Sequence, residues 1–156
     1  MSTRANVGVL QADGTVKVIY SHWDGYPDYL LKTLKRYYNS LEKATALINL
    51  GDASYIGRYI EPSEGVRIFG FDFMLDLPEY AEQLAKLPAE QVRRIKTEYQ
   101  SFDYSRFYGR DRGETGVDAV IYSSVDEWLN NLGLMIEYAY LDTANGLTSR
   151  RKIEIN

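Results

Sequence analysis

The sequence predicts an α+β fold: a single domain over residues 1–156 with a mainly antiparallel sheet, N- and C-terminal β-hairpins and intervening helices. Three observations predict it. Runs of β-branched residues flank tight-turn residues near both ends of the chain. Apolar residues recur at helical spacing between those runs. The length of 156 residues suits one domain, and no repeat, low-complexity tract or linker divides it.

The strands follow from alternation and from turn residues. Asp13-Gly14 and Asn145-Gly146 each supply a glycine that accepts a positive φ, so each predicts a hairpin. Phe71, Phe73 and Leu75 alternate with mostly polar neighbours, which is typical of a half-buried strand. Six strands are expected, at residues 6–11, 16–20, 66–75, 117–122, 134–141 and 147–155.

The helices follow from apolar faces and from capping residues. Ser40 and Ser124 suit N-caps, Pro78 suits the first turn of a helix, and Gly51 suits a C-terminal stop. Helical faces are expected within residues 30–38, 41–48, 78–87, 88–99 and 124–132. Residues 100–116 show no sustained period, so this long connection is expected to be mobile or functional.

Composition narrows the chemistry. The 18 Lys and Arg against 22 Asp and Glu give a net charge of −4, which argues against general nucleic-acid binding. The chain has no cysteine, which excludes disulfides, thiolate nucleophiles and cysteine-bound metals. Its single histidine, His22, excludes multi-histidine metal sites. We expect no cofactor and no metal site; Mg²⁺ bound by carboxylates such as Asp24, Asp52 or Asp111 stays open, although no sequence feature indicates it.

The first candidate binding segment is the loop His22-Trp23-Asp24-Gly25-Tyr26-Pro27, between a strand and a helix. The rings of Trp23 and Tyr26 can stack on a base, while His22 and Asp24 supply directional hydrogen bonds. Gly25 permits close backbone approach to a ligand. A structural alternative stays open, in which the rings fill the edge of the core and Asp24 satisfies turn amides.

The second candidate is the segment 104–114, where arginines alternate with aromatic residues between two glycines. Arginine can bind phosphate oxygens in a bidentate manner, and tyrosine can stack or donate a hydrogen bond. The candidate ligand-binding side chains are Tyr104, Arg106, Tyr108, Arg110 and Arg112. The alternative is a solvated salt-bridge cluster in which Asp103, Asp111 and Glu114 pair with the same arginines.

Two weaker signals lie elsewhere. Tyr55 and Tyr59 fall on no helical or strand face, which hints at a recognition surface because tyrosine is a good interface residue. The basic run at residues 149–152 is expected to protect an exposed edge strand against aggregation. The same edge is also compatible with a homo-oligomer.

Three stretches resemble a family of small tailed-bacteriophage proteins to which no reaction is securely attached. They are the loop at residues 20–27, the helix end Leu47-Ile48-Asn49-Leu50-Gly51-Asp52, and Arg110-Asp111-Arg112-Gly113-Glu114. This chain departs from the family's pattern at residues 34–38, where the relatives' glycine and histidine are missing. The resemblance implies a phage accessory protein acting in the cytoplasm of an infected bacterium.

Three classes of function follow, of which the first is favoured. A non-catalytic counter-defence or host-takeover protein would sequester a small nucleotide-like ligand, with its base on the 22–26 loop and its phosphates on the arginines. A protein–protein inhibitor of a host factor would use an exposed aromatic surface instead. An enzyme would use His22 as acid or base, oriented by a carboxylate such as Asp24, with Arg110 or Arg112 stabilising an anionic transition state. However, no nucleophile signature, P-loop or paired-histidine motif is present. No apolar run is long enough to cross a bilayer, so no membrane contact is expected.

Overall fold

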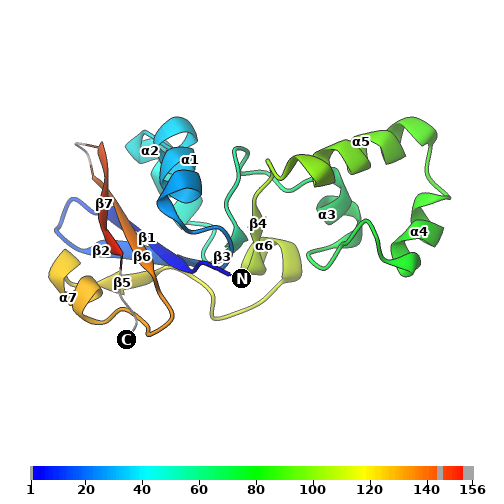
Figure 1. Ribbon diagram of the computed structural model, residues 1–156. Coiled ribbons are helices and arrows are strands. Elements are labelled where there is room, and N and C mark those ends of the chain that lie inside the picture. The colour runs from blue at the N-terminus through cyan, green and yellow to red at the C-terminus, as the bar shows by residue number, and fades with distance from the viewer. Residues whose placement is uncertain (1, 144–145, 153–156) are drawn as a thin grey trace.

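The computed structural model describes residues 2–143 and 146–152 (Figure 1). The strands are β1 (Ala5–Leu10), β2 (Val16–Ser21), β3 (Ala53–Tyr55), β4 (Arg106–Phe107), β5 (Val120–Tyr122), β6 (Tyr138–Thr143) and β7 (Gly146–Lys152). The helices are the π-helical η1 (Pro27–Leu31), α1 (Lys32–Tyr37), α2 (Leu41–Ile48), α3 (Glu64–Phe69), α4 (Pro78–Leu84), α5 (Ala89–Ser101), α6 (Tyr108–Arg112) and α7 (Val125–Asn130). Figure 1 shows two lobes, a sheet lobe and a helical arm formed by α3, α4 and α5 (residues 64–101).

The described strands form one mixed sheet in the order β4-β3-β2-β1-β6-β7, with β5 also paired to β2. Four of its pairings are antiparallel, including the β1–β2 and β6–β7 hairpins. The β1–β6 and β2–β3 pairings are parallel. The α+β class and both hairpins are therefore confirmed, while the sheet is mixed. Turn residues report only on strands adjacent in sequence, so they gave no sign of parallel partners that need long crossovers.

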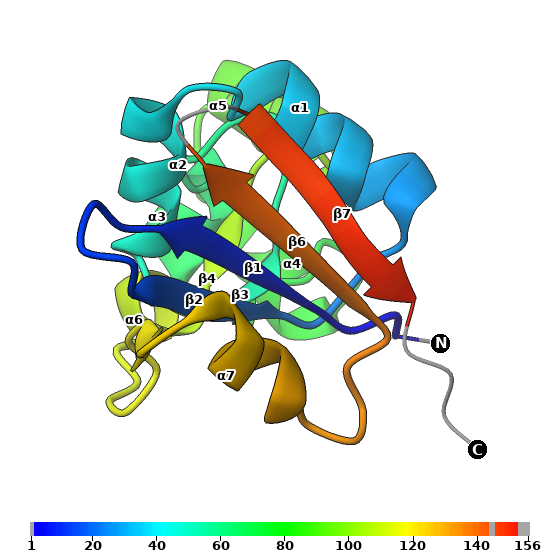
Figure 2. The same cartoon turned by 90° about the vertical axis from the view of Figure 1, so that its left-hand side faces the viewer.

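Helices cover both faces of the sheet (Figure 2). The larger cluster lies under α1 and α2, where Leu34 and Leu47 pack with Val7 and Tyr140, all of them buried. On the other face, the buried Trp128 of α7 packs on strands β1, β2 and β6. The helices begin where their caps predict, since Ser40 accepts a hydrogen bond from the Lys43 amide at 3.1 Å and Ser124 accepts one from Glu127 at 3.0 Å.

The helical arm has a small core of its own. Phe73, Leu84 and Ile95 are buried together, and partly buried aromatic rings surround them. The interval from Pro78 and the interval after Pro88 are helical, as expected. Because this cluster is separate from the sheet's clusters, the arm is a subsidiary packing unit.

The strand expected at residues 66–75 is wrong. The segment instead forms the end of α3 and then turns, with Ser63 as the N-cap accepting from the Val66 amide at 3.4 Å. Phe71 and Phe73 are both buried, but from turns rather than from a strand. The alternation of apolar residues over so short a segment does not distinguish the two structures.

Other boundaries also moved. The long connection at residues 100–116 holds β4 and α6, and the expected strands at 117–122 and 134–141 begin only at Val120 and Tyr138. Asn145 and residues 153–155 lie outside the described residues, and β7 is the last strand on its side of the described sheet. Within the described residues, no helix has the length and apolar character needed to cross a membrane.

Candidate functional site

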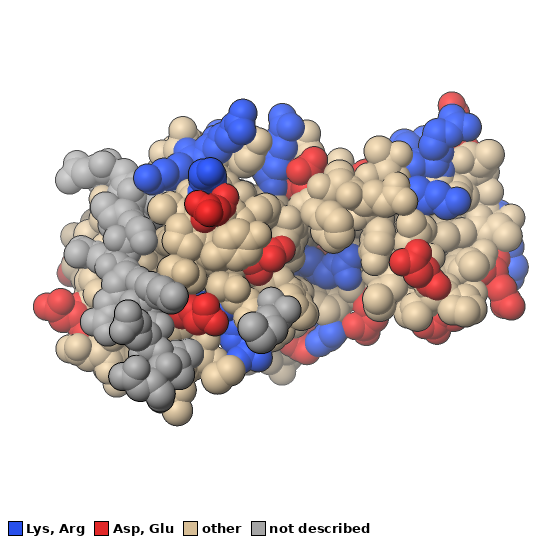
Figure 3. Space-filling view, in the orientation of Figure 1, with Lys and Arg blue, Asp and Glu red and all other residues tan. Residues whose placement is uncertain are grey.

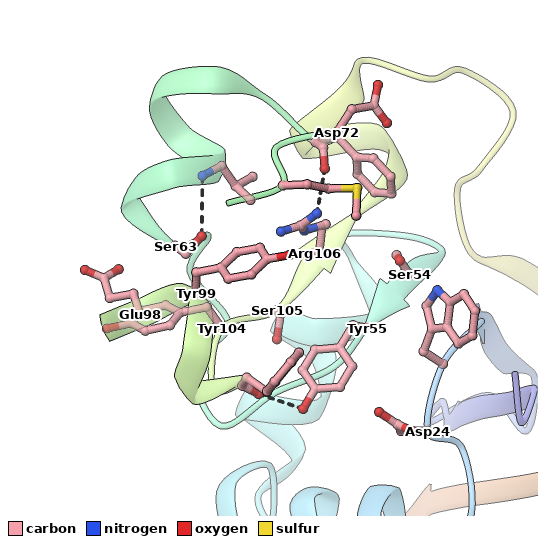
Figure 4. A pocket seen from close by; sticks show the side chains of 15 residues that line it. Asp24, Ser54, Tyr55, Ser63, Asp72, Glu98, Tyr99, Tyr104, Ser105 and Arg106 are labelled. Atoms are coloured by element: carbon pink, nitrogen blue, oxygen red, sulfur yellow. Dashed lines mark hydrogen bonds between the residues drawn. The ribbon is translucent and has the colours of Figure 1, made fainter. Parts of the chain in front are cut away.

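A cavity of about 540 Å³ lies between the helical arm and the sheet lobe (Figure 4). Its wall draws on the β2–η1 loop, β3, the α3 region, the end of α5 and β4. Most of the large side chains that line it are aromatic: Trp23, Tyr55, Phe71, Tyr99, Phe102 and Tyr104. Its charged side chains are Asp24, Asp72, Glu98 and Arg106.

The β2–η1 loop is held in place by backbone hydrogen bonds. The Trp23 amide donates to the Ser54 carbonyl at 3.0 Å, and the Gly25 amide donates to the Thr3 carbonyl at 2.8 Å. The Gly25 carbonyl accepts from the buried Tyr140 hydroxyl at 2.7 Å. A Cβ at Gly25 would lie 2.7 Å from the Cβ of Ala5, so only glycine lets the loop pack this closely. The fold thus presents Trp23 and Asp24 on a fixed support.

Two residues with a left-handed backbone conformation, from segments far apart in the sequence, lie in the cavity wall. In the described part of the chain, the non-glycine residues with positive φ are Asp24 and Phe102, each at 56°. Both line the cavity. A left-handed conformation is costly for a bulky residue such as phenylalanine, and such strain concentrates at functional sites. Phe102 is also the C-cap of α5, and its left-handed conformation turns the chain out of the helix and into the cavity wall.

Tyr55 joins these two segments. Its hydroxyl donates to the Phe102 carbonyl at 2.6 Å and contacts the Tyr29 hydroxyl. Burial raises the pKa of Tyr55, so the hydroxyl remains protonated and a donor. Nearby, the Tyr38 hydroxyl donates to the Gly57 carbonyl at 2.7 Å, and burial raises its pKa to about 12. These neutral tyrosines make this part of the wall rigid.

Arg106 contributes a positive charge without a carboxylate partner. Its Nη1 donates to the carbonyls of Phe71 at 2.7 Å and Phe73 at 3.4 Å. No carboxylate oxygen of the described residues lies within 4.0 Å of its guanidinium. Burial is the largest influence on the pKa of Arg106 and lowers it, while Tyr99, Asp111 and Asp72 act in the opposite direction.

The acidic residues of the wall differ in their partners. Asp72 pairs with Arg112 at 2.9 Å, and Glu98 accepts from the Glu64 amide at 3.0 Å. Asp24 makes no hydrogen bond or ion pair with any described residue. The wall therefore holds one carboxylate, Asp24, without a hydrogen-bond partner among the described residues, and one guanidinium, Arg106, bonded to carbonyls alone. Figure 4 shows Asp24 and Arg106 on different parts of the wall.

The two candidate segments do converge, through four of the nine expected binding residues. Trp23 and Asp24 from the first segment line the same cavity as Tyr104 and Arg106 from the second. Arg110 does not line it, because its guanidinium is bonded to Asp111 at 2.9 Å and to the Ile60 carbonyl at 2.6 Å.

The other expected residues lie around the cavity rather than in its wall. His22 Nδ1 is 2.6 Å from the Tyr20 hydroxyl, and burial lowers the pKa of the imidazole. Tyr26 is exposed. Tyr108 and Arg112 both contact the ring of Phe71, which does line the cavity, at centroid distances of 5.1 Å and 4.0 Å. Their part in binding stays a prediction.

Most of the missed wall residues come from the helical arm. Phe71 and Tyr99 fell on an expected strand face and an expected helical face, so they looked like ordinary core positions, whereas Phe102 follows the arm in the segment without a sustained period. Tyr55 did carry a signal, because it matched no helical or strand face. An aromatic residue without a place in an expected element is therefore the clue that sequence offers for such a wall.

The arrangement is suited to binding a ring and its polar groups. Aromatic faces favour stacking, and the two unpaired charges can orient a polar ligand. His22 bonds to Tyr20 rather than to Asp24, so no acid–base pair of the kind considered from the sequence faces the cavity. Among the described residues, no group of three or more His, Asp or Glu side chains could hold a metal ion.

Comparisons with known proteins add no functional assignment. No protein-family model, no curated protein and no solved structure matches this chain.

Proposed function

We propose that this protein is a non-catalytic binding protein that sequesters a small nucleotide-like ligand in the cavity between its lobes. The observation that carries the proposal is an aromatic cavity with one unpaired carboxylate, Asp24, and one unpaired guanidinium, Arg106. Its volume of about 540 Å³ is typical of small-molecule sites.

The two charged groups define how such a ligand would lie. Arg106 uses Nη1 for the Phe71 and Phe73 carbonyls, which leaves Nε and Nη2 for an anionic group such as a phosphate. The planar ring would stack among the aromatic side chains near Trp23, which is 45% exposed. Asp24 would meet donors on the ring.

The biological setting that we propose is phage infection. An accessory protein in the cytoplasm of an infected bacterium would remove a nucleotide-like host signal by binding it. Such a role needs affinity and abundance rather than turnover.

Thermal unfolding tests the proposal. The purified protein is heated with nucleotides, cyclic nucleotides and ADP-ribose derivatives, each with and without Mg²⁺. A ligand at 100 times its Kd should stabilise the protein by about 2.7 kcal/mol. Arg106→Gln should abolish that stabilisation, while Arg67→Gln, which changes an exposed arginine outside the cavity, should preserve it.

Recovery of the ligand separates binding from catalysis. A compound that stabilises the protein and returns chemically unchanged supports sequestration. A compound that returns altered would make the protein an enzyme. If no compound shifts the unfolding midpoint, the proposed function fails.

A second candidate function, inhibition of a host protein, is favoured by strand β5. Among the described strands β5 pairs only with β2, and Val120 and Ile121 are 53% and 62% exposed. An open strand edge with apolar side chains can accept a strand from a partner. Capture of a host protein that Ile121→Lys abolishes and Arg106→Gln preserves would support this candidate over the first.

A further inference from the structure

We infer that Asp24 selects the ring of the ligand by its hydrogen-bond donors, and that the ring is a guanine or another heterocycle with two adjacent N–H groups. This inference rests on the proposed function and names the class of ring that the cavity takes.

The position of Asp24 favours such a role. The residue belongs to a loop that the Trp23 and Gly25 amides fix to the sheet lobe, and Figure 4 shows its side chain on the same side of the cavity as Tyr55. Its φ of 56° maintains a conformation that asparagine and aspartate adopt more readily than bulkier residues do. The loop therefore holds a carboxylate at the cavity although no described residue bonds to it.

An ionised carboxylate can recognise a ring only by accepting hydrogen bonds from it. Its two oxygens accept hydrogen bonds and donate none when it is ionised. Guanine presents an N1–H and a 2-amino group side by side, so it can donate to both oxygens at once. Adenine presents one amino group beside a ring acceptor, and uracil presents one N–H between two carbonyls. Those acceptors would face the carboxylate with like partial charge.

A ring that cannot donate hydrogen bonds to Asp24 should bind weakly, because binding removes water from the carboxylate. Asp24 is partly exposed and can be hydrated. A ring stacked near Trp23 would displace that water, so the donors that replace it must come from the ring. A site that leaves a buried polar group unpaired rejects the wrong ligand strongly, because the lost hydration is not replaced.

The test compares the monophosphates of guanosine, inosine, adenosine and uridine by calorimetric titration of the wild-type protein. All four share the phosphate that Arg106 would bind, so differences report on the ring. We expect guanosine monophosphate to bind at least ten times more tightly than adenosine monophosphate. Inosine monophosphate, which lacks the 2-amino group, should fall between them.

Asp24→Asn tests the residue itself. Asparagine accepts the same positive φ and keeps the size of the side chain, so the loop should survive. The variant offers one acceptor and one donor, and it should therefore lose affinity for guanosine monophosphate about tenfold or more. It should gain affinity for xanthosine monophosphate, which has a carbonyl in place of the 2-amino group. Asp28→Asn, at an exposed position in η1, is the matched control.

The outcomes separate this inference from the proposed function. Equal affinity for the guanosine and adenosine nucleotides overturns the inference and leaves the proposed function standing. The inference also fails if Asp24→Asn binds all four nucleotides as the wild type does. If none of the nucleotides binds and the wider panel gives no shift, the proposed function fails, and this inference fails with it.

Discussion

Two arginines four positions apart are used in opposite ways. Arg110 lies beside Asp111, whose side chain is 4% exposed, and gives the rest of its donors to the Ile60 and Ser105 carbonyls. Arg106 has carbonyl partners but no carboxylate among the described residues. Arg110 thus serves the fold, while Arg106 lines the cavity without a carboxylate within salt-bridge distance among the described residues.

Arg110→Ala should destabilise the protein. Its loss leaves the buried Asp111 carboxylate without its guanidinium, which costs about 2–4 kcal/mol of unfolding free energy. Urea unfolding monitored by circular dichroism measures the change. Arg112→Ala, whose partners are more exposed, should cost much less. Equal losses in the two variants would contradict this account.

Asp52 makes the stability depend on pH. Burial is the largest cause that raises the pKa of Asp52 above its ordinary 3.8, and the nearby Asp118 adds to it. A raised pKa in the folded state means that ionisation opposes folding, so stability falls as the pH rises above 3.8 and Asp52 ionises.

Asp52→Asn should therefore be more stable than the wild type at neutral pH. The amide is neutral, and its oxygen can still accept from the Tyr20 amide, as Asp52 does at 2.9 Å. The difference should vanish well below the ordinary pKa, where the wild-type carboxyl is protonated too. Thermal midpoints measured across an acid-to-neutral series test both parts, and an advantage that persists in acid would argue against the ionisation.

At the scale of elements, the helical arm depends on close packing at α3. Gly65 lies where a Cβ would meet the ring of Phe73 at 2.4 Å and Ile95 at 3.2 Å. Phe73 is buried in the arm's own cluster. The arm also supplies Phe71, Tyr99 and other wall residues, so its packing determines the shape of the cavity.

Gly65→Ala should destabilise the arm by about 1–3 kcal/mol, because the new methyl group overpacks the contact with Phe73. Hydrogen exchange should show faster opening of α3 and α5 while β1 keeps its protection. Gly109→Ala is the matched control, since a Cβ in α6 would find its nearest neighbour at an ordinary 3.4 Å. Uniform loss of protection across both lobes would show that the arm does not open separately.

Elements specified by neighbouring residues were predicted correctly, whereas pairings between distant segments were not. Local signals such as the Asp13-Gly14 turn and the Ser40 and Ser124 caps gave the β1–β2 hairpin, α2 and α7 correctly. The parallel β1–β6 pairing has no local signature, and the alternation around Phe71 fits turns as well as a strand. The parallel strand pairing and the conformation around Phe71 therefore depend on contacts between distant segments, which local sequence patterns do not reveal.

At the scale of the whole molecule, the cavity joins the two lobes. The sheet lobe contributes Trp23, Asp24 and Tyr55, the arm contributes Phe71 and Tyr99, and the segment after α5 contributes Phe102 and Tyr104. Acidic and basic side chains occur over both lobes on the face shown in Figure 3. Sequence predicted the residues on loops with unusual composition, such as Trp23 and Arg106. It did not predict the arm's aromatic residues, because a cavity wall and a core share one composition.

The two tryptophans should report separately on this arrangement. Trp23 is 45% exposed at the cavity, whereas Trp128 is fully buried in the cluster under α7. Iodide should quench the emission of Trp23 only, so Trp23→Phe should remove the quenchable fraction. Trp128→Phe should retain it, and this change also deletes an indole N–H without a hydrogen-bond partner in the described residues. Strong quenching of Trp23→Phe would place Trp128 in solvent.

The position of β1 in the sheet affects how the protein can fold during translation. β1 lies between β2 and β6, and its parallel partner ends at Thr143 (Figure 2). While the ribosome is still producing the helical arm, the nascent chain can form the β1–β2 hairpin but leaves the other edge of β1 open beside Val7 and Val9. Completion of the sheet must therefore wait for a late part of the chain, and until then the nascent hairpin exposes an unpaired strand edge that can aggregate.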